Sequence, residues 1–449
     1  MALERLAPEL LCSILASLDS PQDLYSLIKA SPASLRVFLA SRRITFSSII
    51  RNAFLPDAIH HALALLHVPK VPETDDMESQ EVEAFSREVK EYLSQYFQPN
   101  PWSFPTDFTN IITLIRLIAR IARFTSRYFD YAMKTMDIEQ DSCLWLLSST
   151  ETARLQRAFL RFEVYCRICP ALDGEAMLST GFQFDYFINK MEPWEVEEIC
   201  CVLEFLRTVV RRDISELEDK FVQTVLGNPH LQTRNVAELQ KHPSRRHYED
   251  GMAYFDIIDL TPLTMFSTHT EDYRPEIVLY IVSLGLGFLD DMMASDQPRG
   301  WEIIQSNLSW RDFLIDALGR ARHTRHTTVA NAVLSPPEGD FTDSGSRPNK
   351  GWFEFNNSYD MWSVGQAFSN PTHGALRICG YMFWDSRRLL YSSVHKALTT
   401  LEDGEGIVMR LYGPELGGVD EESAEEQLEY FQLPRAELEK IWVEFGCPT

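Results

Sequence analysis

The stretch LAPELLCSILASLDSPQDLYSLIKASPASLRVF, from Leu6 to Phe38, contains three signals for the start of a helix in close succession. Pro8 and Glu9 favour a first helical turn, because the N–H that proline lacks would be unpaired there and the helix dipole attracts a carboxylate. The Ser-Pro pair at positions 20–21 fits the start of a second helix, and the pair at positions 31–32 ends that helix and begins a third. The stretch therefore predicts three short helices joined by sharp corners.

These helices carry more apolar residues than a unit of this size can bury internally. In the first helix, Leu10, Ile14 and Leu18 recur at the spacing of one apolar stripe. Three short helices enclose little volume, so part of their apolar surface is expected to lie against another surface. Further apolar positions of the three predicted helices include Leu11, Leu15, Leu24, Leu27, Ile28, Leu35, Phe38 and Leu39.

The same stretch resembles the F-box, a small helical docking module. The likeness covers residues 1–45 and depends on three elements that occur in order, namely the Pro-Glu-Leu start at positions 8–10, Ile-Leu at 14–15 and Asp-Leu at 23–24. Ala7 stands between Leu6 and the proline, and Ala-Ser-Pro at positions 30–32 replaces the cysteine- and tryptophan-bearing end of the animal pattern. This variant resembles the F-box proteins of filamentous fungi, and later segments such as GYMFWDSRRL resemble large helical proteins of the same source.

The resemblance implies a function. In F-box families this module docks on the Skp-type adaptor of a cullin-based ubiquitin ligase, and the remaining domain selects the protein substrate. For this chain the resemblance implies a non-enzymatic substrate-recognition adaptor with an unidentified protein target. The residues that would form the docking surface and its supporting core are Leu6, Pro8, Leu10, Leu11, Ile14, Leu15, Leu18 and Leu24.

A second hypothesis is an intracellular interaction scaffold that has no role in a ubiquitin ligase. Its F-box-like helices would then belong only to the core of the protein. Under this hypothesis Leu10→Asp and Ile14→Asp unfold the protein. Under the adaptor hypothesis, a change at an outward-facing position weakens partner binding and leaves the melting temperature nearly unchanged.

The composition limits the class of protein and its partners. Of 449 residues, 65 are Asp or Glu and 42 are Lys or Arg, which gives a net charge of -23. Such a surface repels nucleic acid and anionic membranes, so neither is expected as a partner. The N-terminus lacks the pattern of a secretory signal, no segment has the apolar length of a membrane span, and the 8 cysteines are scattered. We therefore expect an intracellular protein, in the cytoplasm or nucleus, with reduced thiols.

The remainder of the chain, residues 46–449, shows mostly helical periodicity and predicts one large, irregular helical domain. Segments from Thr150 to Arg167 and from Glu192 to Val210 repeat apolar residues at three- and four-residue steps. Polar or acidic composition predicts loops near residues 71–84, 335–351 and 416–427. Met252 to Leu260 is the best strand candidate. The predicted class is therefore all-α, or nearly so.

Two cysteine pairs raise a third hypothesis, that of a metal protein or enzyme. Cys166 and Cys169 form a C-x-x-C motif, and Cys200 and Cys201 could complete four thiolate ligands for zinc. Both pairs lie in helical patterns, where adjacent cysteines point in different directions. Buried free cysteines are the favoured interpretation, and we expect neither a catalytic residue nor a metal or cofactor.

An aromatic cluster follows the loop near residues 335–351. Such a cluster usually belongs to the core. Aromatic residues beside arginines also resemble the composition of binding hot spots, so this region is the best candidate for a substrate-binding groove. The groove candidates are Trp352, Tyr359, Trp362, Trp384 and Arg387.

Overall fold

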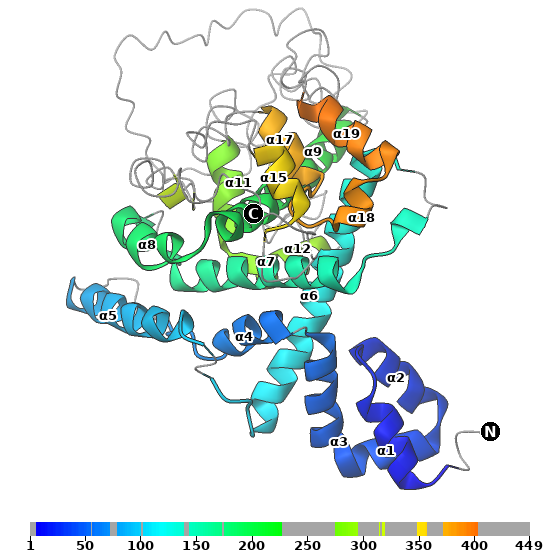
Figure 1. The fold of residues 1–449 in the computed structure, drawn as a ribbon. Coiled ribbons are helices and arrows are strands. Elements are labelled where there is room, and N and C mark those ends of the chain that lie inside the picture. The colour runs from blue at the N-terminus through cyan, green and yellow to red at the C-terminus, as the bar shows by residue number, and fades with distance from the viewer. Residues whose placement is uncertain are drawn as a thin grey trace, which may run out of the picture. The chain divides into compact units, whose positions relative to one another are not determined.

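In a computed structural model of the chain, the residues described are 6–54, 56–71, 79–99, 102–138, 143–172, 175–226, 274–294, 314, 317–318, 348–356 and 371–402. They form a mostly helical fold (Figure 1), which confirms the predicted class. Within these ranges the only β structure is one pair of two-residue strands, β1 (Ala171–Leu172) and β2 (Glu175–Ala176). None of the helices described has the combined length and apolar composition of a membrane span.

The chain divides into two compact units. The first unit, which holds most of the described helices, comprises Met1–Pro170, Ala176–Phe205 and Leu314–Leu411. The second unit comprises Ala171–Glu175, Leu206–Phe313 and Tyr412–Thr449.

Three helices open the first unit, and each begins at a proline, as the sequence predicts. They are α1 (Pro8–Ala16), α2 (Pro21–Ala30) and α3 (Pro32–Ala53). The Ser20 side chain accepts hydrogen bonds from backbone N–H groups of the first turn of α2, and the Ser31 side chain accepts one from the first turn of α3. Local capping therefore explains where α2 and α3 start, whereas α1 begins at Pro8 without a side-chain cap.

The third helix is longer than the short helix that we expected. It crosses residue 45, the expected end of the module, with one non-helical residue at Ser41 (φ −122°, ψ 16°). Beyond Ser41 the helix continues because its apolar face is buried, with Ile49 and Ile50 fully inaccessible. Near its end the Asn52 amide donates to the carbonyls of Ala16 and Leu18, both at 2.9 Å, and so fixes the end of α1.

The three helices share their core with α6 (Phe108–Thr135), which Figure 1 shows beside α3. Leu15, Leu24 and Ile49 form the buried centre of this core. Ile115 of α6 packs against the same cluster. The α1–α3 unit is therefore part of a larger packed structure and does not end at residue 45.

The middle of the first unit is built on two long helices, α6 and α7 (Ser149–Ile168). The Asp107 side chain caps α6, and Ser148 and Glu151 form a capping box at the start of α7. The surrounding elements are α4 (Pro56–Ala64), α5 (Ser79–Tyr96), η2 (Cys143–Trp145), α8 (Thr180–Tyr186), η3 (Ile188–Lys190) and the first part of α9 (Pro193–Leu226), which continues into the second unit from Leu206. Helix α5 begins at Ser79, so the loop expected near 71–84 is wrong over its second half.

The later helices of the first unit are α15 (Lys350–Asn356), α17 (Pro371–Ile378), α18 (Ser386–Leu389) and α19 (Ser392–Glu402). Gly380 follows α17 with φ +74°, and a Cβ there would lie 2.5 Å from the Trp384 ring. This position therefore requires glycine on two grounds. The second unit contains α11 (Arg274–Ser283) and α12 (Gly285–Ala294).

Several predictions fall on parts of the chain that the structure does not describe. The loop near 416–427 and the strand candidate Met252 to Leu260 lie outside the described residues. The loop near 335–351 lies outside them up to residue 347, and its end belongs to α15, which starts at Lys350.

Candidate protein-interaction surface and buried polar contacts

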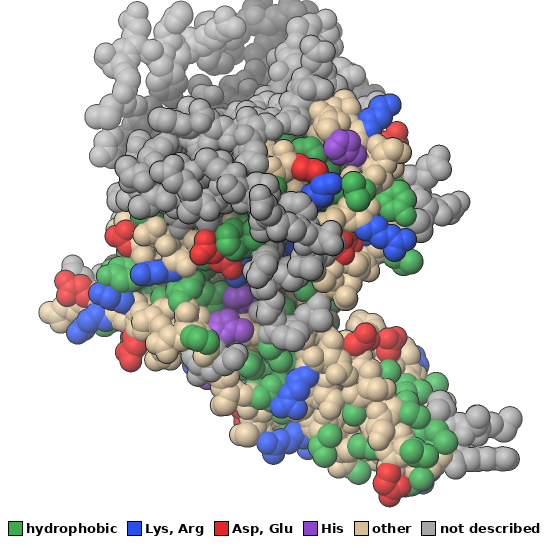
Figure 2. All heavy atoms as spheres, viewed as in Figure 1, with side chains coloured by type: hydrophobic (Ala, Val, Ile, Leu, Met, Phe, Trp, Pro, Cys, Tyr) green, Lys and Arg blue, Asp and Glu red, His purple; other side chains and the backbone are tan. Residues whose placement is uncertain are grey.

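Large apolar side chains are exposed on the α1–α3 unit, over which Figure 2 shows hydrophobic side chains in green. Leu10 of α1 has 54% of its surface exposed, and Tyr25 of α2 has 61%. An exposed apolar cluster of this kind marks a site of contact with another molecule in many soluble proteins. The exposed positions, which we call the α1–α3 apolar surface, are Leu10, Tyr25, Leu35, Leu39 and Ile44.

The eight predicted docking residues divide into surface and core. Pro8 and Leu10 are exposed. Three others are buried and hold the helices together, namely Leu11, Leu15 and Leu24. The remaining three, Leu6, Ile14 and Leu18, are half-buried.

Of the five members of the α1–α3 apolar surface, only Leu10 belongs to the predicted docking residues. Leu35 and Leu39 were expected only as apolar positions of the third helix, and the remaining two were not expected at all. Tyr25 directly follows the buried Leu24, and Ile44 directly precedes the buried Thr45. Successive residues of a helix point about 100° apart, so the face opposite a buried position could have been read from the helical period. This reasoning requires the buried face of each helix to be known first. That face is determined by packing among the three helices and against α6.

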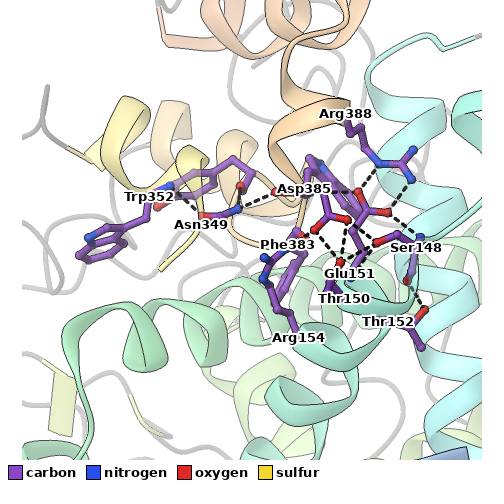
Figure 3. A network of polar contacts seen from close by, with 12 residues as sticks. Ser148, Thr150, Glu151, Thr152, Arg154, Asn349, Trp352, Phe383, Asp385 and Arg388 are labelled. Atoms are coloured by element: carbon purple, nitrogen blue, oxygen red, sulfur yellow. Dashed lines mark hydrogen bonds and ion pairs between the residues drawn. The ribbon is translucent and has the colours of Figure 1, made fainter. Parts of the chain in front are cut away.

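A polar network joins the start of α7 to α18 (Figure 3). The Asp385 carboxylate accepts hydrogen bonds from the hydroxyls of Ser148 and Thr150, the latter at 2.7 Å. The buried Arg154 guanidinium donates to the same carboxylate at 2.8 Å and to the Phe383 carbonyl at 3.0 Å. The Asp385 carboxylate balances the charge of Arg154, and these contacts fix Asp385, which precedes α18.

Arg388 completes the network from the side of α18. Its buried guanidinium donates to both carboxylate oxygens of Glu151, at 2.7 and 2.6 Å. It also donates to the carbonyl of Leu144 and, at 2.7 Å, to that of Leu146. The rings of Phe129 and Trp384 lie within cation–π distance, at 5.2 and 5.4 Å. Arg388 therefore fixes α18 to α7 and to the segment before α7.

Another buried ion pair joins α9 to α17. The Arg377 guanidinium donates to both oxygens of Glu197, at 2.7 and 2.8 Å, and the Tyr381 hydroxyl donates to Glu197 at 3.0 Å. Burial by itself lowers the pKa of Arg377, but the Glu197 carboxylate raises it well above its ordinary value. Burial and Glu197 both raise the pKa of Tyr381. Arg377 therefore stays charged and Tyr381 stays protonated at neutral pH, which suits a structural contact.

Five of the described cysteines are buried. Cys166, Cys169, Cys200, Cys201 and Cys379 are buried free thiols, which confirms the interpretation as small core residues. Burial raises the pKa of the thiols at positions 200, 201 and 379, so they stay protonated at neutral pH and are poor nucleophiles. Within the ranges described, no three or more His, Cys, Asp or Glu side chains gather in a way that could hold a metal ion.

Two histidines of α4 contact α5 in a partly aromatic cluster. The Nδ1 atom of His61 lies 2.8 Å from the Tyr96 hydroxyl, and the Nε2 atom of His60 lies 2.8 Å from the Tyr96 carbonyl. The Trp102 ring packs against both His60 and Tyr96. Burial, and then the charge of Arg161, holds the pKa of His61 well below its ordinary value of 6.5. His61 is therefore a neutral core residue near neutral pH.

The five groove candidates do not form one exposed site. Trp384 is fully buried and Trp352 is 6% exposed, so the groove interpretation is wrong for both and they belong to the core. The Asn349 amide fixes this part of the core by donating to the carbonyls of Tyr381 and Trp384. Arg387 is exposed. Tyr359 and Trp362 lie outside the described residues.

The first unit thus presents two features that bear on function, an exposed apolar surface on α1–α3 and a rigid polar network at α7 and α18. Both are properties of this chain's own residues. Comparison of the chain with family models, with curated proteins and with solved structures returned no match.

Proposed function

We propose that this chain is a non-enzymatic substrate-recognition adaptor of a cullin-based ubiquitin ligase. It docks on a Skp-type adaptor through α1–α3 and binds a protein target through the remainder of the chain. The observation that supports this proposal is that Pro8 and Leu10, which belong to the F-box-like pattern, are exposed beside further apolar side chains of α2 and α3. An adaptor of this kind acts in the cytoplasm or nucleus.

The exposed apolar area favours association with a partner. Full burial of one large apolar side chain stabilises a complex by about 1.5–3 kcal/mol before the costs of association are counted. Five such side chains form the α1–α3 apolar surface, all at least 40% exposed. Burial of most of this area in one interface favours binding, most strongly if the surface is held in one conformation before the partner arrives.

The core beneath this surface supplies that rigidity. Leu11, Leu15 and Leu24 are buried under the exposed positions, and Asn52 fixes the end of α1. A surface that is ordered before binding loses little conformational entropy when the partner arrives. The predicted docking set therefore combines contact residues with the residues that position them.

Co-purification with a Skp-type adaptor tests the proposal. The full chain should retain the adaptor, and the double variant Leu10→Asp, Leu39→Asp should lose it, because the two charges would be buried without a partner. Leu390→Asp is the matched control, since Leu390 is 68% exposed but lies on the turn after α18. Point variants are preferable to deletion of residues 1–43, because α3 continues to Ala53 and shares its core with α6.

The outcome distinguishes the adaptor from a scaffold with no ligase role. The continuation of α3 into a core shared with Ile115 favours the scaffold, because it makes α1–α3 part of the protein's own packing. A wild-type chain that folds but retains no Skp-type adaptor contradicts the adaptor proposal. Equal retention by the wild-type chain and the double variant contradicts the assignment of the surface.

A further inference from the structure

We infer that the end of α18, the start of α19 and the segment before α7 form a docking surface for an acidic peptide that carries an apolar side chain. This α18–α19 surface comprises Leu146, Arg387, Leu390, His395 and Lys396. The inference deepens the proposed function and rests on it in one respect, because it assigns target binding to this surface. The chemistry of the surface is independent of any adaptor.

The apolar part of the surface consists of Leu146 and Leu390. With 76% and 68% of their surfaces exposed, they are the most exposed large apolar side chains among the described residues. They come from segments far apart in the sequence, and the Leu146 carbonyl lies 2.7 Å from the guanidinium of Arg388, two positions before Leu390. Tertiary structure therefore brings two exposed leucines into one neighbourhood.

These leucines are held in place by the buried network of Figure 3. Arg388 connects the Leu144 and Leu146 carbonyls to Glu151 of α7. Asp385, at the start of α18, is fixed by Arg154 and Thr150. A surface fixed in this way is organised before binding, which is typical of energetically important contacts.

The charged part of the surface is basic in an otherwise acidic protein. From Ser386 to Leu401 the chain contains no Asp or Glu, and Arg387, His395 and Lys396 are exposed. Over this region Figure 2 shows basic, histidine and hydrophobic side chains, with some acidic side chains among them. Two carboxylates of the adjoining segments are paired, that of Asp385 with Arg154 and that of Glu354 with Lys350. Along the chain, the next carboxylate after residues 386–401 is that of Glu402, at the end of α19.

Local charge decides what binds here, in spite of the net charge of -23. At physiological ionic strength the Debye length is about 8 Å, so a bound peptide interacts mainly with the charges next to it. Carboxylates of the peptide would pair with Arg387 and Lys396, and its apolar side chain would cover Leu390. The exposed leucines favour a peptide over a nucleic acid, whose backbone offers them nothing to bury against.

Fluorescence anisotropy with the full chain and short labelled peptides tests this inference. The first probe alternates Glu and Leu with Ser and Gly. The second carries Lys in place of Glu, and the third carries Ser in place of Leu. We expect the first probe to bind at least about tenfold more tightly than either of the others, because it alone matches both parts of the surface. A labelled single-stranded oligothymidine serves as the nucleic-acid probe and should not bind.

Matched variants locate the site. Arg387→Glu and Leu390→Ser should each weaken binding of the first probe by about tenfold, as expected for contacts at the centre of an interface. Arg116→Glu, at an exposed arginine of α6, and Leu10→Ser, on the α1–α3 apolar surface, should leave this binding unchanged. Equal binding of the Glu and Lys probes, or tight binding of oligothymidine, overturns the inference.

The same variants separate this inference from the proposed function. Leu10→Ser should weaken retention of the Skp-type adaptor and keep peptide binding, and Leu390→Ser should do the reverse. If the wild-type chain binds no peptide but retains the adaptor, the inference fails and the proposed function stands. If it binds the acidic peptide at this surface but retains no adaptor, the proposed function fails and the peptide site stands.

Discussion

The α1–α3 unit and helix α7 distribute their side chains in opposite ways. On α1–α3, large apolar side chains are exposed to solvent, and Leu10, Leu39 and Ile44 are each more than half exposed. In α7, charged side chains are buried together with the apolar ones. The buried charged residues of α7 are Glu151, Arg154, Arg157, Arg161 and Glu163. Residue type alone therefore does not decide which side chains of this protein are buried.

The difference arises from the neighbours that each helix has. Every buried charge of α7 pairs with an opposite charge, as Arg157 does with Glu198 and Glu163 with Arg167. A buried ion with such a partner avoids most of the cost of leaving water, whereas an unpaired one does not. For the α1–α3 apolar surface, the described part of the chain provides no such cover. The buried charges of α7 therefore find their partners within the protein, whereas the exposed apolar side chains of α1–α3 have no such cover among the described residues.

The largest expected effect comes from Arg388→Ala. The change leaves the buried Glu151 carboxylate without its ion-pair partner and removes the donor from two carbonyls. We expect the free energy of unfolding to fall by about 3–5 kcal/mol, measured by urea denaturation. Arg387→Ala is the control at the adjacent, exposed position and should change it by less than about 0.5 kcal/mol. Similar urea midpoints for the two variants would contradict the view that the buried charge of α7 depends on its ion-pair partner.

Within α1–α3, replacing a core leucine should cost much more free energy of unfolding than replacing a surface leucine, and the difference should be nearly as large as that between Arg388→Ala and Arg387→Ala. Leu15 is fully buried in the cluster with Leu24 and Ile49. Leu15→Ala should lower the free energy of unfolding by about 3 kcal/mol, because it removes buried apolar contacts and leaves a cavity. Thermal denaturation of this variant beside Leu10→Ala provides the measurement. If both variants melt together, the division of the docking residues into core and surface is wrong.

A smaller effect concerns pH and the buried His61. Its pKa in the folded protein lies well below 6.5, first because of burial and then because of Arg161, His60 and Arg157. The unfolded chain therefore binds more protons below pH 6.5, and stability falls as the pH falls through this window, by up to about 1.4 kcal/mol per pH unit. Above pH 6.5 this contribution is fully present.

Urea denaturation at several pH values measures this slope. His61→Gln should make it shallower below pH 6.5. Some slope should remain, because burial also lowers the pKa of the neighbouring His60. A variant with the wild-type slope would mean that His61 takes up its proton equally in both states.

The smallest expected effect on stability is that of Leu39→Ser. Leu39 is 58% exposed, so its replacement should change the free energy of unfolding by less than about 0.5 kcal/mol. Differential scanning calorimetry measures the shift. A loss of several kcal/mol would show that this face is covered by the protein itself and would favour the scaffold.

The start positions of the helices could be predicted from the sequence. Pro8, Pro21 and Pro32 begin the first three helices, and Pro193 begins α9. The expected helix from Thr150 to Arg167 differs from α7 by one residue at each end. The all-α class and the burial of the paired cysteines were likewise predictable. Capping and periodicity are set by residues within one or two turns, so the sequence alone contains this information.

Other features depend on residues that are distant in the sequence. The Arg377 and Glu197 side chains that pair in the core are separated by 180 positions, and Arg388 and Glu151 by 237. No local pattern indicates such partners, so these ion pairs could not be predicted from the sequence. The aromatic composition favoured a core position for Trp384 but did not exclude the groove. The sequence also could not predict that Arg387 is exposed while the adjacent Arg388 is buried.

By itself, the sequence therefore determined where helices begin, which class of fold they form and that α1–α3 carries more apolar residues than it can bury. Only the tertiary structure decided which of these apolar residues remain exposed and which charges are paired inside. The physical reason is that helix capping is a local interaction, whereas burial and charge pairing depend on what the rest of the chain places beside each residue. Leu10 and Leu15 lie five positions apart in one short helix, yet the first is exposed and the second is fully buried.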